Sequence, residues 1–520
     1  MLNHRSALWY TALLIAWSAD LLFWDKAPGI SFPLFLTLAL GGLILLGLRE
    51  GKPPHPRSRW LAAGALAFAW LTFLRQEPFT RGLSLLAAVG LAGLFTLSFR
   101  GGRWLQYNLG DYVVGGLKQF FYTLGLPLQP LSSSGEGKQK PESSRSWLPY
   151  LRGVILALPV LAALGALLGA ADPLYQDWLT GLLDFLDLDR FPEYLLRGAL
   201  IGIWTFLLAG LFLAALLKSD EKQLVGESES WPPQLVGITE AAVVLGGVNA
   251  LFFSFLFFQF KYFFGGEENI SRSGYTYAEY ARRGFGELLA VAFFTLALFL
   301  ILSAVTRRET PRSQKVFSGM TAVLTASIGI ILYSSLQRLG LYEAAYGFSR
   351  LRTYAHLCML WIGFLFLGLL VLEITGRWGY FTTACLASVL GFILTLSAVN
   401  VDGLITDRNL TRAAEGAPLD ASYLETLSHD AVPRLIEGLK RENLNPDQQE
   451  ELGALLACRA AQLGAASSAW PSFTLPPYRA RRLLDSSQEL WEEYTVFRME
   501  SGWGVLVGGD VRRCRRPGWD

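Results

Sequence analysis

Charged residues are scarce in this chain. Asp, Glu, Lys and Arg make up 17% of the 520 residues, whereas soluble domains contain about 25%. The two signs nearly cancel, with 45 Lys and Arg against 43 Asp and Glu, so the chain lacks the basic footprint that binding to nucleic acid requires. The composition therefore excludes an ordinary soluble protein and a nucleic-acid partner.

Cysteine and histidine are also rare, at four residues each, and they show no CxxC pair and no spacing typical of metal ligands. Cys358 and Cys385 lie in apolar runs, where cysteine is an ordinary small hydrophobic residue. Cys458 and Cys514 lie in the polar tail and could form a disulfide only outside the cytoplasm. Walker loops and the HExxH and GxSxG motifs are missing. The sequence thus predicts no metal and no other cofactor, and it does not favour an enzyme.

Long hydrophobic runs are what the chain has in abundance, since 52% of its residues are hydrophobic. About 17 to 25 apolar residues in a row are typical of a helix that crosses a bilayer, where a helix satisfies its own backbone polar groups. The sequence predicts an all-α fold, a polytopic transmembrane helix bundle of about eleven spans. These lie near residues 8–24, 30–48, 60–74, 82–98, 151–170, 194–217, 238–260, 286–305, 316–336, 353–373 and 379–398. In the first run, Trp17 stands where a signal peptide needs a small residue, so we expect this run to be retained.

Four regions follow from the runs and the polar segments between them. Residues 1–103 hold the first four spans, and residues 104–147 hold an interfacial amphipathic helix and a flexible cytoplasmic linker. Residues 148–400 form the membrane core with spans five to eleven, and residues 401–520 form a small soluble helical domain. The short 60–74 run and the 104–125 segment are the two stretches whose crossing the sequence leaves open.

Loop charges predict the orientation. Lys and Arg are concentrated in alternate loops, those after the second, fourth and eighth spans, and the positive-inside rule places such loops in the cytoplasm. The N-terminus is then cytoplasmic, and eleven spans place the C-terminus outside the cytoplasm. The expected location is the cell (inner) membrane, where membrane lipids are partners.

The C-terminal region shows helix start signals at Asp430 before Pro433 and at Asn445 before Pro446. Ser428, His429 and Asp430 are adjacent, so they cannot converge as a catalytic triad does, and we interpret Ser428 or Asp430 as a helix cap. The final stretch, 505–520, is rich in Gly and Arg, which predicts poor order.

A first polar and aromatic cluster lies at the entrance to the eighth predicted span. Its candidate ligand- or lipid-binding residues are Tyr277, Glu279, Tyr280, Arg282, Arg283 and Glu287. Glu279, Arg283 and Glu287 are spaced four residues apart and share one helical face. One interpretation is an interfacial collar of aromatic and charged residues. The other is a site for a phosphate or carboxylate, which guanidinium groups bind in a bidentate way.

A second cluster lies at the start of the tenth predicted span and contains Glu343, Tyr346, Arg350 and Arg352. The predicted topology places both clusters on the outer face. Together they could hold an anionic lipid head group, another anionic ligand or a protein partner. Structural anchoring of the helix ends is the alternative for each cluster.

Several stretches resemble a bacterial family of multi-spanning membrane proteins, domain of unknown function 4173, which is related to domain of unknown function 4153. They read ALLGAADPLYQDWL, SGYTYAEYARRGFGELLAV, LQRLGLYEAAYGFSRLRTYAHLCMLW, VNVDGLITDRNLTRA and LDASYLETLSHDAVPRL, and they span roughly residues 150 to 440. The resemblance implies an inner-membrane protein and leaves its activity open. The positions that it carries over are Asp172, Tyr277, Glu279, Tyr280, Arg282, Arg283, Glu343, Tyr346, Arg350, Arg352, Asp402 and Asn409. Thr406 departs from the small apolar residue of the family's pattern.

Three functions remain open at this stage. The first is a sensor or accessory component that binds a ligand, lipid or partner through the two outer clusters. The second is a transporter of a small solute, which predicts a water-lined cavity reaching Asp20, Glu240 or Asn249. The third is a membrane enzyme acting on a lipid-linked substrate, with Glu279 or Glu343 as acid or base. The sequence identifies neither the substrate nor the oligomeric state.

Overall fold

The computed structural model describes residues 5–128, isolated positions between 153 and 176, and residues 191–219, 235–263, 285–441, 444–465, 469–500 and 502–515. The described residues form two compact units. The first unit contains residues 1–66, 90–102 and 113–222, and the second contains residues 67–89, 103–112 and 223–520.

Long apolar helices dominate the described part of the chain, and nine of them are long and apolar enough to cross a membrane. This confirms the predicted all-α polytopic fold. The nine are α1 (Arg5–Phe23), α2 (Ser31–Arg49), α4 (Pro78–Leu97), α8 (Phe191–Lys218), α9 (Ile238–Phe263), α12 (Phe285–Val305), α13 (Pro311–Tyr346), α14 (Arg350–Thr375) and α15 (Phe381–Val399). The uncertain third run is a helix too, α3 (Pro56–Leu74), but it is not among the nine. The predicted fifth span, 151–170, falls largely outside the described residues.

In the first unit α1 packs against α2 and α8. Asp20 near the end of α1 receives hydrogen bonds from Arg197 of α8, with Nε 3.1 Å from Oδ1 and Nη2 2.6 Å from Oδ2. The Arg197 guanidinium also lies over the Trp24 ring. The carboxylate predicted as a candidate transport group is therefore neutralised by an ion pair between two helices.

The predicted amphipathic segment forms helix α5 (Leu109–Gly125). Val113, Leu117, Phe120 and Phe121 are exposed along it, at the spacing that places apolar residues on one helical face. Such a stripe is typical of a helix that lies in the membrane interface. The linker that follows, 129–147, lies outside the described residues.

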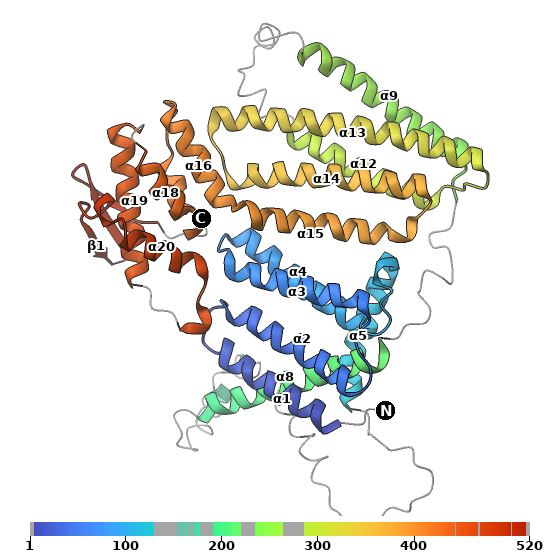
Figure 1. The fold of residues 1–520 in the computed structure, drawn as a ribbon, viewed down its shortest axis with the longest axis horizontal. Helices are drawn as coiled ribbons and strands as arrows, with labels where there is room; N and C mark the ends of the chain where they lie inside the picture. Colours follow the sequence, from blue (N-terminus) through green and yellow to red (C-terminus); the bar gives the residue numbers. More distant parts are fainter. Residues whose placement is uncertain are drawn as a thin grey trace, which may run out of the picture. The chain divides into compact units, whose positions relative to one another are not determined.

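In the second unit α13 packs against α9, α12 and α14, and α14 packs against α15 (Figure 1). Their contacts bury an apolar core. It includes Leu245 of α9, Phe299 of α12, Ile328 of α13 and Met359 of α14. Burial of this kind stabilises by about 25 cal/mol for each Å² of apolar surface in water, but lipid already solvates such side chains, so close packing matters more inside a bilayer.

A C-terminal domain of shorter helices follows α15. It contains α16 (Val401–Ala414), α17 (Ala421–Thr426), α18 (Val432–Leu439), α19 (Pro446–Ala465) and α20 (Leu475–Asp485), with 3-10 turns η5 (His429–Ala431) and η6 (Trp470–Ser472). The start predicted at Asn445 is confirmed, since Asn445 accepts a hydrogen bond from the Gln448 amide. Ser428 is a cap as predicted, because it accepts the Asp430 amide at the start of η5. A helix does begin beside Pro433, but its N-cap residue is Ala431, without a side-chain hydrogen bond, and not Asp430. Asn400, in the left-handed conformation, separates α15 from α16.

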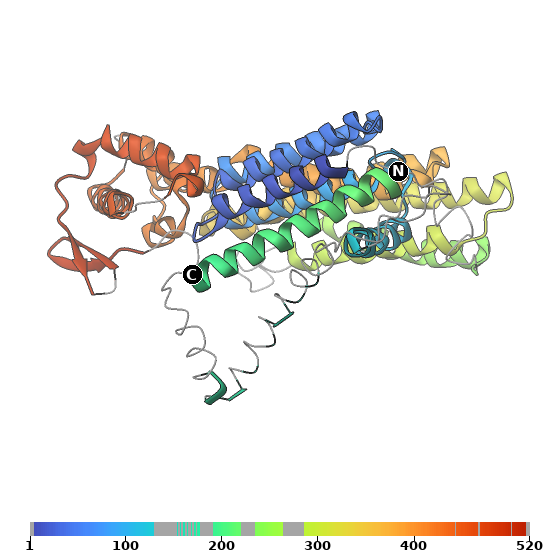
Figure 2. The ribbon, with the colours of Figure 1, turned by 90° about the horizontal axis from the view of Figure 1, so that it is seen from below.

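The end of the chain differs from the sequence prediction of a poorly ordered tail. Three strands, β1 (Val496–Met499), β2 (Gly502–Val507) and β3 (Asp510–Arg513), form an antiparallel sheet at the edge of the C-terminal domain (Figure 2). The glycines that suggested disorder form turns, because Gly508 and Gly509 adopt positive φ angles of 56° and 91° between β2 and β3, a conformation that glycine adopts without steric penalty. Only 516–520 of the predicted tail lie outside the described residues.

Candidate functional site

In the second unit the start of α14 and the end of α15 lie beside α16, the first helix of the C-terminal domain (Figure 1). A group of charged and polar side chains gathers there. We call it the junction cluster. Its members come from the α3–α4 loop, α14, α16 and the turn before α18, and they are Arg75, Glu77, Arg350, Tyr354, Asp402, Ser428 and Asp430. The cluster connects helix ends of the bundle to the C-terminal domain.

Arg350 and Asp402 form the centre of the junction cluster. Arg350 Nε lies 2.8 Å from Asp402 Oδ1, and Arg350 Nη2 lies 2.7 Å from Oδ2. Asp402 is fully buried, and Oδ2 also accepts the Ser428 backbone amide at 2.7 Å. A bidentate guanidinium–carboxylate pair is stronger and more directional than a single hydrogen bond. It fixes α14, α16 and the turn at Ser428 to one another.

Asp430 extends the cluster to the loop between α3 and α4. Its Oδ2 accepts the backbone amides of Gln76 at 2.7 Å and Glu77 at 3.3 Å, while Oδ1 lies 3.7 Å from Arg75 Nη1. Ser428 connects the two acids, because its hydroxyl donates to Asp430 Oδ2 at 3.3 Å and its backbone amide donates to Asp402 Oδ2. Burial raises the pKa of Asp430, and the amide of Gln76 and the charge of Arg75 oppose that rise.

Glu77 directly precedes α4 and caps its N-terminus. Its carboxylate accepts the amides of Phe79 and Thr80 at 2.9 Å and 2.7 Å, which satisfies donors that the first turn of a helix leaves free. Tyr354 Oη donates to Glu77 Oε1 at 2.6 Å. Through this bond α14 contacts the start of α4, so both helix ends belong to the cluster.

Arg75 closes the cluster on the side of α15. Its Nε donates to the carbonyl of Ser397 at 2.6 Å, and Arg75 also pairs with Asp430. A free carbonyl in the last turn of a helix carries partial negative charge, which a cation stabilises. Arg75 therefore ties the end of α15 to the α3–α4 loop.

The turn between α13 and α14 is held by α16. Asn409 accepts the Phe348 amide at 2.8 Å and donates to the Phe348 carbonyl at 3.0 Å. Gly347 adopts a φ of 82°, and an added Cβ would lie 2.8 Å from Asn409 Oδ1, so both conformation and space require glycine here. Arg412 donates to the carbonyls of Ala344 and Ala345 at the end of α13.

A second layer of buried charge lies inside the C-terminal domain. Arg459 of α19 is 1% exposed, and its Nη2 donates to the carbonyls of Glu425 and Leu427. Burial lowers the pKa of Arg459 to about 10, so it stays protonated at neutral pH. Burial, with the charge of Arg459, lowers the pKa of His429 to about 3, so this imidazole is neutral.

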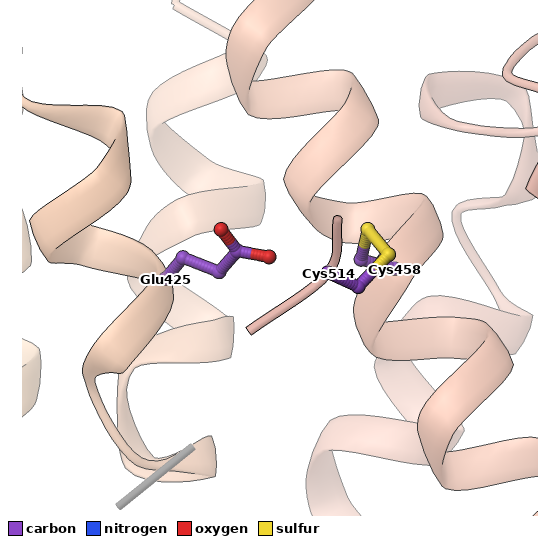
Figure 3. Close-up of side chains that lie close together, drawn as sticks. All are labelled: Glu425, Cys458 and Cys514. Carbon is purple, nitrogen blue, oxygen red and sulfur yellow. A yellow bond between two sulfur atoms is a disulfide. The ribbon is translucent and has the colours of Figure 1, made fainter. Parts of the chain in front are cut away.

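Cys458 of α19 and Cys514 after β3 form a disulfide, with Cα atoms 5.6 Å apart. Glu425 of α17 points toward this disulfide (Figure 3). The three side chains are close enough to share a metal ion, but sulfurs bonded to each other offer no thiolate ligand. Instead, Glu425 accepts the amide of Arg515 at 2.7 Å and lies 3.8 Å from Arg512. The trio holds the strands against α17 and α19.

The opposite end of the bundle has its own buried ion pair. Glu373 near the end of α14 is 0% exposed, and it accepts hydrogen bonds from Arg308 at 2.7 Å, Ser318 at 3.0 Å and Trp378 at 2.9 Å. These partners come from the α12–α13 loop, α13 and the turn before α15. Each end of α14 is therefore anchored by one buried carboxylate–arginine pair.

The structure describes only part of the predicted clusters. Of the first cluster, Tyr277, Glu279, Tyr280, Arg282 and Arg283 lie outside the described residues, and Glu287 is exposed in the first turn of α12. Their role as a binding site stays a prediction.

The second predicted cluster lies around the α13–α14 turn. Glu343 is buried, with Oε1 3.3 Å from His356 Nδ1, and Tyr346 is exposed. The Arg352 guanidinium lies 4.2 Å from the Tyr342 ring centroid and donates to the Gly347 carbonyl. Arg350 joins Asp402, which brings together two residues that the sequence analysis named separately.

Sequence reasoning missed Arg75, Glu77 and Tyr354. Arg75 and Glu77 occupy the short polar interruption between two apolar runs, which is the one sequence signal that could have indicated them. Asp430 was interpreted only as a cap, and its carboxylate binds the amides of a loop more than 350 residues away in the chain.

The junction cluster carries acceptors that are already satisfied by protein donors. Removing buried charges from water costs several kcal/mol for each ion, and a close pair with further hydrogen bonds offsets this cost. Such a network adds little net stability compared with apolar packing. It does fix one arrangement of the helices and loops that it connects. The junction cluster is therefore better suited to hold the C-terminal domain against the helix ends than to catalyse a reaction at its carboxylates.

A family model described as a domain of unknown function, DUF4153, matches residues 62–438. The match supports the predicted relation to domain 4153 and does not confirm the predicted resemblance to domain 4173. It includes the whole junction cluster, while Cys458, Cys514 and the sheet lie beyond it. Comparisons with curated proteins and with solved structures found no match.

Proposed function

The chain belongs to the DUF4153 family, and on this premise we propose that it is a sensor or accessory component of the inner membrane. In this proposal the C-terminal domain and the neighbouring helix ends bind a ligand, lipid or protein partner. The junction cluster passes the resulting change to α4, α14 and α15. The observation that carries the proposal is the continuous set of buried bonds from Asp402 through Ser428 to Asp430 and the α3–α4 loop.

The proposal places the C-terminal domain outside the cytoplasm and the N-terminus inside it. Two independent observations support this orientation. Lys and Arg are concentrated in the loops on the opposite side, and Cys458 and Cys514 are paired as a disulfide, which persists in an oxidising compartment. The domain is then exposed to ligands that do not enter the cell.

The ligand-binding part of the proposal rests on the two sequence clusters. Arg282 and Arg283, with Tyr277, Glu279 and Tyr280, would bind an anionic group on the outer face. Arg352 and Tyr346 would belong to the same face, at the turn that Asn409 and Arg412 hold. Arg350 is engaged by Asp402, so its role in this proposal is to couple the domain to α14 and not to contact the ligand.

A sensor must transmit a change from one end of α14 to the other. The test introduces Asp402→Asn and measures how fast maleimide labels a cysteine placed at Arg377, beyond the inner end of α14. The labelling is done in a variant that lacks Cys358 and Cys385. We expect the labelling rate to change at least about fivefold, the lower limit of typical coupling between sites.

The matched control is Asp420→Asn, because Asp420 is exposed and caps the N-terminus of α17 in the same domain. It should leave the labelling rate unchanged. An identical rate at position 377 in wild type and Asp402→Asn would refute transmission through the junction cluster.

A transporter is the second candidate, and one observation favours it. Asn249 in the middle of α9 is buried and donates to the Met320 carbonyl at 3.1 Å, while its Oδ1 lacks a hydrogen-bond partner among the described residues. Polar groups buried in a span mark solute pathways in transporters. Asn249→Leu would then abolish solute flux in liposomes, and a protein without flux of any tested solute would argue for the sensor.

A further inference from the structure

The C-terminal domain carries an aromatic and basic surface whose residues have no named part in the proposed function. We call it the α20 surface. It consists of Trp470 of η6, Phe473 directly after η6, and Tyr478, Arg479, Arg481 and Arg482 of α20. It lies apart from the junction cluster along the chain and uses none of its residues.

Contacts between rings fix the depth of this surface relative to the helix ends. Phe73 in the last turn of α3 lies 5.8 Å from both the Trp70 and the Phe473 ring centroids. The Phe473 ring in turn lies 5.5 Å from that of Tyr478. Apolar sequence stops at Leu74, and the polar Arg75 follows. Arg75 donates to the Ser397 carbonyl in the last turn of α15, a helix long and apolar enough to cross a membrane. Residues that touch Phe73 therefore lie near the end of a candidate span, the level at which a bilayer surface is expected.

The exposed side chains are of the kinds that prefer this level. Trp470 is 59% exposed and Tyr478 is 53% exposed. Trp and Tyr are enriched at membrane interfaces, because an apolar ring and a polar group are each satisfied there. In a water-soluble domain, by contrast, such rings are usually more buried.

The arginines of α20 are unusual in having no internal partner. Arg479, Arg481 and Arg482 are all exposed. Within the described part of the chain none of the three has an ion pair or a side-chain hydrogen bond, although Arg434 and Arg441 of the same domain both pair with acids. Asp485 is the acidic residue of the helix, so α20 keeps a net positive charge.

Opposite these arginines the helix is anchored to the domain. Pro476, Ala480 and Leu484 are buried and recur every fourth residue, so they form one face of α20. Tyr478 and Arg482 therefore face away from the domain, and Arg479 and Arg481 lie on either side of them. The helix presents its charges on a surface that the domain does not cover.

We propose that the α20 surface binds the head groups of anionic phospholipids. The rings of Trp470 and Tyr478 enter the interface, and the three guanidinium groups bind lipid phosphates. Guanidinium binds phosphate in a bidentate way, and each basic residue near an anionic surface strengthens binding about fivefold, on the order of 100-fold for three. The interaction would hold the C-terminal domain against the bilayer independently of the junction cluster.

The test uses the full chain in nanodiscs that contain equal amounts of phosphatidylglycerol and phosphatidylcholine. Tyr478 is replaced by the photo-cross-linker benzoylphenylalanine, and lipid adducts are identified by mass. We expect an anionic-to-zwitterionic adduct ratio about fivefold or more above the mixing ratio. The ratio should approach the mixing ratio in about 1 M salt, where the screening length is ~3 Å.

Variants separate this surface from the general charge of the domain. R479Q/R481Q/R482Q should reduce the adduct ratio to the mixing ratio, while R479K/R481K/R482K should keep most of the enrichment. The matched control R434Q/R441Q/R498Q removes the same charge from exposed positions elsewhere on the domain and should keep the enrichment.

Three results would overturn the proposal. They are a wild-type adduct ratio equal to the mixing ratio, an enrichment that survives R479Q/R481Q/R482Q, and a complete lack of lipid adducts at position 478. The salt dependence of the wild type needs no variant, so the proposal stays testable even if the glutamine variant does not fold.

Discussion

Arg350 at the start of α14 and Asp402 in the first turn of α16 form a bidentate ion pair, and Asp402 is completely shielded from solvent. The pair joins the last part of the membrane bundle to the first helix of the C-terminal domain. Since Ser428 binds the same carboxylate, the pair also reaches the turn that carries Asp430.

Asp402→Asn should destabilise the C-terminal domain by about 3 kcal/mol, because breaking a buried pair leaves the Arg350 charge without compensation. The measurement is the free energy of opening from hydrogen exchange of amides in α16 and α18. Asp420→Asn is the matched control, and it should change this free energy by less than about 0.5 kcal/mol, as is typical of surface substitutions. A cost below about 1 kcal/mol for Asp402→Asn would mean that the pair is not important for docking.

Replacing Cys458 and Cys514 by serine should destabilise the sheet and α19 by about 4 kcal/mol, the loop-entropy value for a sequence separation of 56 residues. Hydrogen exchange of β1–β3 measures the loss. Serine at Cys358 and Cys385, which are free thiols, is the control and should not affect the sheet.

The same cysteines test the orientation in intact cells. In a variant that lacks Cys358 and Cys385, maleimide should label Cys458 and Cys514 only after reduction. A disulfide requires an oxidising compartment, so labelling without reductant would place the C-terminus in the cytoplasm.

Acid should destabilise the C-terminal domain through His429. Its folded pKa of about 3 lies below the ordinary 6.5, so its contribution to stability is present above pH 6.5 and is lost as the pH falls from there toward 3. At pH 5 the loss is about 2 kcal/mol. When the pH is lowered from 7 to 5, the opening free energy of wild type should fall by about 2 kcal/mol more than that of His429→Gln.

Asp430 acts in the opposite direction. Burial raises its pKa, so its contribution favours the folded state at low pH and is lost as the pH rises. Asp430 makes the same contribution in wild type and in His429→Gln, so it cancels when the pH dependence of the two proteins is compared. Equal pH slopes in both would show that His429 is not buried in its neutral form.

Asn409→Ala should loosen the α13–α14 turn, because the amide and the carbonyl of Phe348 both lose their partner. An unsatisfied buried polar group costs about 1–3 kcal/mol. Exchange of the Phe348 amide should accelerate at least about fivefold, the factor that corresponds to the lower limit of this cost. Thr411→Ala, on an exposed side of the same helix, should leave that amide unchanged.

The bundle could be predicted from sequence because its signal is local. A run such as 353–373 indicates a helix through composition alone, and the structure has α14 there. The caps at Ser428 and Asn445 were predictable for the same reason, since a cap and its helix are adjacent in the chain.

The site could be predicted only in part, because its contacts join distant segments. Arg350 and Asp402 were each indicated, but not as a pair, since no periodicity relates two helices 52 residues apart. No sequence pattern indicates that Asp430 binds the α3–α4 loop. The sheet was missed because glycine in β2 and in the following turn resembles the composition of a disordered tail.

The most direct test of the central claim, that the junction cluster acts as one unit, is a double-mutant cycle between Asp402 and Asp430. Opening free energies of the C-terminal domain are measured by hydrogen exchange for Asp402→Asn, Asp430→Asn and both together. Residues in one network show interaction energies of about 0.5–3 kcal/mol, so we predict a value in this range. The reference cycle pairs Asp402 with Glu437, an exposed residue of α18 outside the junction cluster, where additivity is expected. An Asp402–Asp430 interaction energy near zero, equal to that of the reference cycle, would contradict the account.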